Sequence, residues 1–417
     1  MSIYLLATLD TKGPEAVFVR DRLRELGQCV TLVDTGCLGQ PSVAAEITRE
    51  AVFSAAGTTL EHAVARADRG EAIAAAARGA ATIASSALAR QELCGIVALG
   101  GSAGTTIGTT AMRGLPLGIP KLMVSTLASG QVRPYVGDKD ILMLNSVVDI
   151  AGVNRISRQI LGNAAAAMAG MVRDRLRVEV SDRPLIAASM FGVTTPCVQQ
   201  ARVILEDAGF EVLVFHATGN GGQAMESLIA DGLIAGVLDI TTTELADELV
   251  GGVLSAGPER LTAAGRAGVP QVISVGALDM VNFGPPDTVP EKFRARKFHQ
   301  HNPTVTLMRT TADENARLGD EIGRKASAAR GPTCVMLPLQ GVSAIDREGQ
   351  SFDDPAARRQ LFDAIRSHRG PFELVELNCH INDAEFATTA ARKLMQMIAS
   401  PAARRGQPAG PHQGSQA

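Results

Sequence analysis

The 417-residue chain is poor in aromatic side chains: only 3% of its residues are Phe, Trp or Tyr, and Trp is absent. The core must therefore be built from Ala, Val, Leu and Ile, which is typical of buried parallel sheets covered by helices. The chain also lacks a strong charge imbalance, with a formal net charge of −3 and a pI near 6.2. This near-neutral balance gives no general attraction to nucleic acid or to an anionic membrane, so we expect neither as a partner.

Cysteine pairs and long apolar runs are missing as well. The six cysteines are scattered without a Cys-x-x-Cys pair, which argues against a zinc knuckle and against a disulfide framework. No apolar run approaches the 18 or more residues of a membrane helix. The start, "MSIYLLATLD", has no basic segment before its apolar residues and predicts a first strand rather than a signal peptide. We therefore expect a soluble, cytoplasmic protein.

Short apolar runs alternate with Ala-rich helical stretches along most of the chain, which predicts repeated βαβ units and parallel sheets. The expected strands cover residues 3–7, 29–33, 95–99 and 121–125 in the first half, and 185–189, 211–215, 236–240, 271–275, 305–308, 334–338 and 373–377 in the second. The length exceeds that of one usual core, and a charged segment over 177–184 divides the halves. We predict an N-terminal domain over 1–180, a C-terminal domain over 181–400 and a disordered tail over 401–417.

The two halves echo each other. "LRELGQCVTLVDTG" is similar to "LEDAGFEVLVFHATG", and "CGIVALGGSAGTTIG" occupies the same place in the order as "AGVLDITTTELADEL". Two pairs in the same order indicate related domains, so the predicted fold class is α/β with two Rossmann-like, doubly wound parallel-sheet domains. In such sheets the loops after the strands form the ligand crevice, and facing domains would place two sets of loops around an inter-domain cleft.

The glycine-rich stretch "LGGSAGTT" follows the third expected strand and places Thr105 and Thr106 at or near the N-cap of a helix. Backbone N–H groups at a helix start, which glycines allow a ligand to approach, bind phosphate. Neither the P-loop pattern nor G-x-G-x-x-G is present, however. From the residues alone, an anion site and a tight strand-to-helix turn stay equal alternatives. The candidate phosphate-binding residues are Gly100, Gly101, Ser102, Ala103, Gly104, Thr105 and Thr106.

Three neighbouring loops offer further nucleotide-binding candidates. Asp10, Thr11 and Lys12 end the first strand and could hold a phosphate with its metal; alternatively Asp10 or Thr11 is the N-cap of a helix that starts near Pro14. Asp34, after the second strand, could accept a ribose hydroxyl. Ser125 and Thr126 open a long polar passage over 125–154, which supplies Arg133, Tyr135, Asp138, Lys139, Asp140, Asn145 and Asp149. A loop of this length is typical of a functional segment, although an ordinary crossover with a short strand stays an alternative.

The second half supplies the catalytic candidates. His216 precedes a second glycine-rich turn with Gly219, Gly221 and Gly222, and Asp239 and Glu244 flank the run Thr241–Thr243, where a capping box of Thr241 with Glu244 is an alternative. His299 and His301 would share one face of an extended segment, which a metal could use, although a third ligand is evident only if His380 or Asp239 joins in space. The general-base candidates are His216, His299 and His301.

Motifs in order over both halves carry a resemblance to a known family. They include "LATLDTKGPE", "LGGSAGTT", "YVGDKDI", "HATGNGGQAME", "TTTELADELVGG" and "RKFHQHNPTVTLMRTT". The chain resembles bacterial relatives of the N-terminal, ATP-binding domain of the tomato mosaic virus resistance protein, a largely uncharacterised family. The resemblance implies two Rossmann-like subdomains, a homodimer, and ATP with Mg²⁺ in the N-terminal half, where residues 100–106 would hold phosphates beside residues 10–12.

The expected function is that of a cytoplasmic ATP-binding protein, with ATP used on a small metabolite in the inter-domain cleft if the protein is an enzyme. One alternative is a non-catalytic ATP-sensing protein that docks a protein partner. A nicotinamide-dependent oxidoreductase is less favoured because G-x-G-x-x-G is missing. The sequence leaves open whether any reaction is catalysed.

Overall fold

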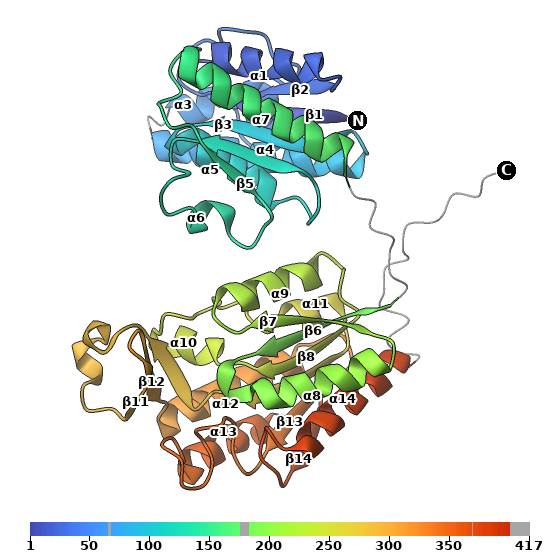
Figure 1. The fold of residues 1–417 in the computed structure, drawn as a ribbon, viewed down its shortest axis with the longest axis vertical. Helices are drawn as coiled ribbons and strands as arrows, with labels where there is room; N and C mark the ends of the chain where they lie inside the picture. Colours follow the sequence, from blue (N-terminus) through green and yellow to red (C-terminus); the bar gives the residue numbers. More distant parts are fainter. Residues whose placement is uncertain (66–67, 176–182, 369, 401–417) are drawn as a thin grey trace, which may run out of the picture. The chain divides into compact units, whose positions relative to one another are not determined.

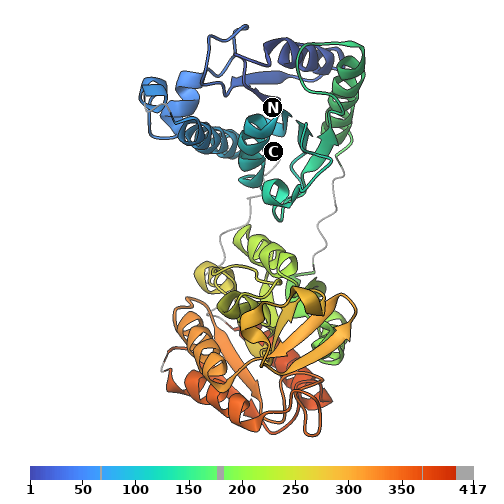
Figure 2. The same ribbon diagram turned by 90° about the vertical axis from the view of Figure 1, so that its left-hand side faces the viewer.

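A computed structural model describes residues 1–65, 68–175, 183–368 and 370–400. The chain forms two compact units, Met1–Glu179 and Val180–Ala417, and each has a parallel sheet of its own (Figures 1 and 2). Residues 176–182 of the predicted linker and the whole predicted tail, 401–417, lie outside the described residues.

The first unit is built on a five-stranded parallel sheet in the order β2-β1-β3-β4-β5. Its strands are β1 (Ser2–Ala7), β2 (Val30–Asp34), β3 (Leu93–Gly100), β4 (Lys121–Ser125) and β5 (Leu142–Asn145). The chain therefore runs outward from β1 in one direction and returns to continue at β3 in the other. In sheets of this order the ligand crevice lies beyond the carboxyl ends of the strands at this switch point.

Helices cover both faces of this sheet (Figure 1). Apolar side chains of α1 (Gly13–Glu25) and α7 (Arg155–Arg173) form one core layer with the strands. The opposite layer contains α2 (Arg49–Ala55), α3 (Leu60–Ala65), α4 (Arg69–Ala89) and α5 (Ser102–Arg113). The short α6 (Arg133–Val136) lies in the predicted polar passage. Small Ala side chains make up much of the second layer, as the composition predicts.

Helix α4 is long and apolar enough to cross a membrane by length and hydropathy alone. The sequence shows no such uninterrupted apolar run, because Arg69, Glu71 and Arg78 are charged. In the fold α4 buries a row of alanines against the core. A Cβ on its Gly79 would lie 1.9 Å from the Val52 carbonyl oxygen of α2. This close packing identifies α4 as a core helix of an α/β unit.

The second unit repeats the arrangement with a larger parallel sheet, in the order β14-β13-β9-β8-β6-β7. Its strands are β6 (Leu185–Met190), β7 (Glu211–His216), β8 (Gly236–Thr241), β9 (Gln271–Gly276), β13 (Thr333–Pro338) and β14 (Glu373–Leu377). The order β7-β6-β8-β9 matches β2-β1-β3-β4 of the first unit. The sequence similarity between the two halves therefore corresponds to a shared strand order. The predicted fold class of two doubly wound sheets is confirmed.

Helices again form a layer on each face of the second sheet. One layer contains α8 (Thr195–Asp207) and α14 (Ala384–Ala399). The other contains α9 (Asn220–Ala230), α10 (Glu244–Val250), α11 (Ala263–Ala267), α12 (Ala312–Ser327) and α13 (Pro355–Ser367). Short 3₁₀ turns lie at Gly192–Thr194, Pro286–Thr288 and Glu291–Phe293.

A small antiparallel sheet interrupts the second unit between β9 and β13. It consists of β10 (Met280–Phe283), β11 (Phe298–Asn302) and β12 (Val305–Arg309), in the order β10-β12-β11. The strand expected at 305–308 therefore exists but does not belong to the parallel sheet. β10 was not predicted because it is only four residues long and lies in a Pro-rich stretch.

Candidate nucleotide-binding site

A cavity of about 240 Å³ lies at the carboxyl edge of the first sheet, lined by residues that follow β1, β2 and β3. The fold therefore places it at the switch point between β1 and β3. Eight predicted nucleotide-binding residues line it: Asp10, Thr11, Lys12, Gly100, Gly101, Ser102, Ala103 and Gly104. Asp149 from the long polar passage lines it too. The residues missed by sequence reasoning are Thr8, Thr35, Cys37, Leu38, Arg69, Ile73 and Ile107.

Helix α5 begins earlier than the sequence predicts. Gly101 is its N-cap and Ser102 its first residue, so Thr105 and Thr106, expected at or near the N-cap, are the fourth and fifth residues of the helix. The N–H groups of Ser102, Ala103 and Gly104 belong to the first turn and have no carbonyl partner four residues back. Since all three residues line the cavity, the positive end of the helix dipole adjoins it.

The glycines of this loop serve two purposes. A Cβ on Gly100 would lie 2.8 Å from the Gly104 Cα, and a Cβ on Gly104 would lie 3.0 Å from the Leu99 carbonyl oxygen. These two glycines are required by the turn itself. At Gly101, by contrast, a Cβ would lie 3.7 Å from Thr126 Oγ1, an ordinary contact. The tight turn and the open helix start are therefore compatible, and Gly101 is the position where a side chain can be added without a backbone clash.

Four predicted ligand residues support the loop and do not line the cavity. The hydroxyls of buried Thr105 and Ser125 share a hydrogen bond of 2.7 Å, and Ser125 Oγ also accepts the Leu127 N–H at 2.9 Å. Thr106 donates its hydroxyl to the Ser102 carbonyl at 3.0 Å. The Thr126 N–H donates to the Gly100 carbonyl at 3.4 Å. These bonds fix the glycine-rich loop between β3 and β4.

The carboxylates of Asp10 and Asp34 are engaged within the protein. Asp34 is buried, accepts the Leu9 and Gly36 N–H groups at 3.1 and 2.9 Å, and pairs with Arg49 Nε at 2.7 Å. Asp10 Oδ2 accepts the Leu38 N–H at 2.8 Å and so shapes the cavity wall. The N-cap alternative for Asp10 or Thr11 is wrong, because Lys12 is the N-cap of α1 and makes no side-chain cap bond; the proline expected in the first turn is present.

The cavity has side chains of both charges and one thiol. Lys12 and Arg69 supply cations, and Asp10 and Asp149 supply carboxylates. Burial raises the pKa of the Cys37 thiol, and the nearby Asp10 carboxylate raises it further. Cys37 is therefore protonated at neutral pH and is no activated nucleophile.

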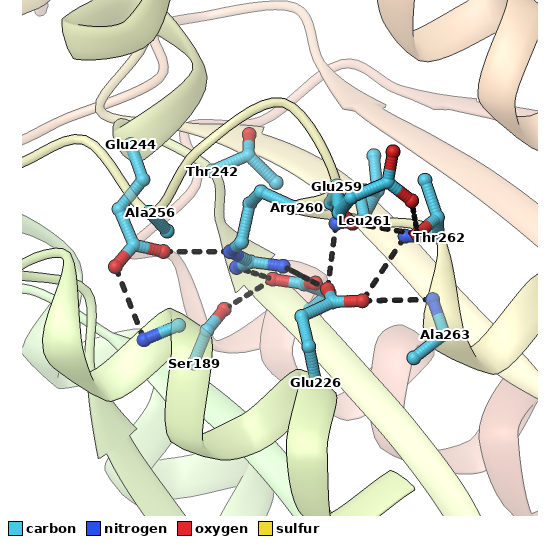
Figure 3. Close-up of polar contacts among 12 residues, drawn as sticks. Ser189, Glu226, Thr242, Glu244, Ala256, Glu259, Arg260, Leu261, Thr262 and Ala263 are labelled. Carbon is cyan, nitrogen blue, oxygen red and sulfur yellow. Dashed lines mark hydrogen bonds and ion pairs between the residues drawn. The ribbon is translucent and has the colours of Figure 1, made fainter. Parts of the chain in front are cut away.

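The five catalytic candidates all lie in the second unit. Two of them, Asp239 and Glu244, form ion pairs with the fully buried Arg260. Figure 3 shows Glu244 and Glu226 beside Arg260. Arg260 donates to both Asp239 oxygens at 2.6 and 2.7 Å, and its Nε donates to Glu244 Oε2 at 2.6 Å. Glu226 is a third carboxylate, 3.2 Å from Arg260. Burial raises the pKa of Glu244, while Arg260 acts in the opposite direction.

Glu244 also occupies the second anion-binding turn that the sequence predicts. Its Oε1 accepts the N–H groups of Gly219 at 2.7 Å and Gly222 at 3.1 Å. A Cβ on Gly222 would lie 2.2 Å from Glu244 Oε2, so the glycine makes room for the protein's own carboxylate. The capping-box alternative is wrong, because Thr243, not Thr241, is the N-cap of α10 and makes no side-chain cap bond.

The candidate histidines do not come together. His216 is exposed at the end of β7, with its ring 5.5 Å from that of Phe191. His299 Nδ1 lies 3.2 Å from Ser351 Oγ, and the register of β11 shifts between Gln300 and Asn302, which interrupts the alternation expected for His299 and His301. Buried His380 contacts the Ser343 carbonyl instead. In the described ranges, no three His, Cys, Asp or Glu side chains gather as a metal site.

Comparison with known proteins places this architecture in a family. The N-terminal domain of the uncharacterised protein family UPF0261 matches residues 1–177, and the C-terminal domain of the same family matches residues 183–398. The chain belongs to the UPF0261 family. A UPF0261 protein from Clostridium tetani is 49% identical over 398 residues, covering 95% of this chain and 98% of that protein. Another from Rhizobium meliloti is 48% identical over 93% of this chain and 97% of its own length.

A plant relative matches part of its length. The ToMV resistance protein Tm-1 of Solanum lycopersicum is 46% identical over 337 residues, which cover 79% of this chain and 45% of the plant protein. The predicted resemblance to the tomato mosaic virus resistance protein is therefore confirmed.

Proposed function

We propose that the N-terminal unit binds ATP in the cavity between β1 and β3. The observation that carries this proposal is the start of α5, where Ser102, Ala103 and Gly104 line the cavity with N–H groups that have no helical partner. Such a helix start attracts phosphate through directed hydrogen bonds and the helix dipole. Lys12, whose Nζ donates to the Ile150 carbonyl, adds a positive charge to the same cavity.

The size and lining of the cavity suit the phosphate end of a nucleotide. At about 240 Å³ it is smaller than the roughly 300–1,000 Å³ of sites that enclose a whole drug-sized ligand. We infer that it encloses the phosphates, while Leu38 and Ile73 offer apolar surface to the nucleoside. ATP is the phosphate ligand that the family resemblance implies.

The glycine-rich turn of the second unit differs from that of the first, and the difference supports the proposal. Its glycine-rich turn has amides of the same kind, but Glu244 accepts two of them and Arg260 neutralises that carboxylate. The Glu244 carboxylate already occupies this turn. A phosphate from solution would therefore bind at the corresponding turn of the first unit. His216, His299 and His301 do not line the cavity. The proposal is therefore ATP binding without an assigned reaction.

Magnesium would accompany the phosphates. Asp10 and the hydroxyls of Thr8 and Thr11 line the cavity, and carboxylate and hydroxyl oxygens are the ligands that Mg²⁺ prefers. We infer that Asp10 would hold the ion and that Mg²⁺ would screen the phosphate charge against this carboxylate.

The substitution Gly101→Val tests the proposal. Gly101 has φ −79° and ψ −151°, an extended conformation open to L side chains, so the variant should fold. Its methyl groups would obstruct close approach to the α5 amides. We expect ATP affinity in isothermal titration calorimetry to fall at least about a hundredfold, the range of a lost set of charge-assisted bonds, with an unchanged melting temperature.

Gly162→Ala on α7 is the matched control, since nothing lies within 4 Å of a Cβ there. This variant should bind ATP as the parent does. Parental ATP affinity in a folded Gly101→Val protein would contradict the proposal, as would a parent protein that does not bind ATP.

A further inference from the structure

Asp149 is the carboxylate of the cavity that the protein leaves free. Asp34 is buried and paired with Arg49, and Asp10 holds the Leu38 amide. Asp149, in contrast, is exposed and lines the cavity, and its carboxylate has no hydrogen bond or ion pair with any residue that the structure describes. A free carboxylate in an anion-binding cavity repels the phosphates where no cation lies between them, and its oxygens are open to hydrogen-bond donors of the same ligand.

The turn that carries Asp149 is anchored to the first turn of α1. Lys12 Nζ donates to the Ile150 carbonyl, and the buried Glu15 accepts the Gly152 N–H at 2.5 Å through Oε1. On the other side, the Ser146 N–H donates to the Ser125 carbonyl at 3.1 Å. Asp149 is therefore held between α1, which follows one cavity loop, and β4, which adjoins the glycine-rich loop.

The same turn has an unfavourable backbone conformation. Val147 has φ +61°, in the left-handed region that a β-branched residue adopts only when other contacts enforce it. Its side chain is 72% exposed, so core packing does not require this conformation. The Val147 N–H donates to Asn145 Oδ1 at 3.2 Å, and the anchors at Ser146, Ile150 and Gly152 lie on either side of Asp149.

We propose that Asp149 selects ligands that carry vicinal hydroxyls next to their phosphates, as ribonucleotides do, and that Lys12 and Glu15 position it. The inference rests on the proposed function. A carboxylate accepts hydrogen bonds from both hydroxyls of a ribose. A ligand without them gives the carboxylate no hydrogen bond and leaves only its repulsion of the phosphates, so such a ligand binds more weakly.

The test compares three probes on the full chain by calorimetry: ATP, 2′,3′-dideoxy-ATP and inorganic tripolyphosphate. The parent should bind ATP at least about tenfold more tightly than dideoxy-ATP, the effect of one good hydrogen bond to a charged group. Asp149→Asn should reduce this preference to about threefold or less. Its affinity for tripolyphosphate should be equal to that of the parent or higher, because a negative charge is removed.

Glu15→Ala removes the acceptor of the Gly152 N–H and tests the positioning role at a residue outside the cavity lining. We expect it to reduce the preference for ATP over dideoxy-ATP while the affinity for tripolyphosphate stays unchanged, a split that general destabilisation would not produce. Asp21→Ala is the matched control and should behave as the parent, because Asp21 is an exposed carboxylate of α1 that pairs only with the neighbouring Arg20 among the described residues.

The outcomes separate the two proposals. Equal binding of ATP and dideoxy-ATP by the parent, or an undiminished preference in Asp149→Asn, overturns the inference while ATP binding stands. If the parent binds neither nucleotide, the proposed function and this inference both fail.

Discussion

At the scale of single residues, Asp247 shows how burial changes an acidic side chain. Its Oδ1 accepts the N–H groups of Leu254 and Asn282 at 3.2 and 3.1 Å, and Oδ2 accepts Asn282 Nδ2 at 2.7 Å. Burial raises its pKa to about 7 in spite of these bonds. Asn282 Oδ1 is buried without a partner among the described residues. If the Asn282 side-chain amide is flipped, so that Oδ1 and Nδ2 exchange positions, a protonated Asp247 can donate a hydrogen bond to this oxygen.

This raised pKa predicts a stability that depends on pH. The unfolded carboxyl loses its proton near pH 4 and the folded one near pH 7, so the native state binds more protons in between. Stability should therefore fall as pH rises from about 4 to 7 and level off above. The asparagine of Asp247→Asn is neutral at every pH. When the free energy of unfolding, measured with urea, is plotted against pH, this variant should show a slope that is shallower than the parent's by up to about 1.4 kcal/mol per pH unit.

The slope should not vanish in this variant, because burial and the nearby Asp346 also raise the pKa of Asp279 to about 7. The exposed Asp207→Asn is the control and should keep the parental slope. An Asp247→Asn protein with the parental pH dependence would contradict the prediction.

The sequence identifies acidic residues after strands, but it does not show which of them are already paired. Asp10, Asp34 and Glu244 all follow or adjoin a strand end, and all were candidate site residues. Arg49 and Arg260, which occupy two of them, lie 15 and 16 residues further along the chain. Such ion pairs form only when the fold brings residues from different segments together, so no local sequence pattern predicts them.

At the scale of elements, the packing of α4 against α2 requires a glycine at position 79, because there is no room for a side chain there. Gly79→Ala would bring a Cβ to 1.9 Å from the Val52 carbonyl oxygen, so α2 and α4 would have to separate. We expect a loss of about 1–3 kcal/mol in the free energy of unfolding, the usual effect of overpacking. Gly162→Ala on α7, where a Cβ has open space, should instead stabilise by about 0.5–1 kcal/mol, because Ala is the better helix former.

Chemical denaturation of both variants measures the difference. The prediction fails if Gly79→Ala is as stable as Gly162→Ala, since the two changes differ only in what surrounds the added methyl group.

Elements with strong apolar runs were predictable and polar ones were not. β4 and β14 have the expected bounds because their runs are bounded by turn residues. The start of α5 was misplaced because its N-cap is Gly101 with no side-chain cap bond, so the usual Ser, Thr, Asp or Asn signal does not apply. β11 forms by pairing with β12, and its polar residues 298–302 give no alternating pattern.

At the scale of the whole molecule, each unit has its own apolar core. The two clusters of the first unit draw on residues up to Val172, and those of the second begin at Leu185. We therefore expect residues 1–179 alone to unfold cooperatively and to bind ATP within about twofold of the full chain, since a domain with its own core can fold independently. Thermal unfolding and calorimetry on this fragment check the expectation. A fragment that is unfolded, or folded without ATP affinity that the full chain has, would contradict it.

The repetition of the two sheets was visible in the sequence, because "GIPKLMVST" and "GVPQVISVG" mark the same strand in both halves. The difference between their crevices was not visible. It depends on Glu244, which a sequence reader would equally assign to a helix cap, and on Arg260, which lies in a loop without a motif.

Glu244 can also be regarded as a permanently tethered ligand. Because it is part of the chain, its effective concentration at the Gly219 and Gly222 amides does not depend on any concentration in solution, and it cannot diffuse away. A free phosphate would have to displace a carboxylate that is also bound to Arg260. Substitutions in this turn therefore act on the stability of the fold, whereas substitutions in the glycine-rich loop of the first unit would act on ligand affinity under the function proposed above.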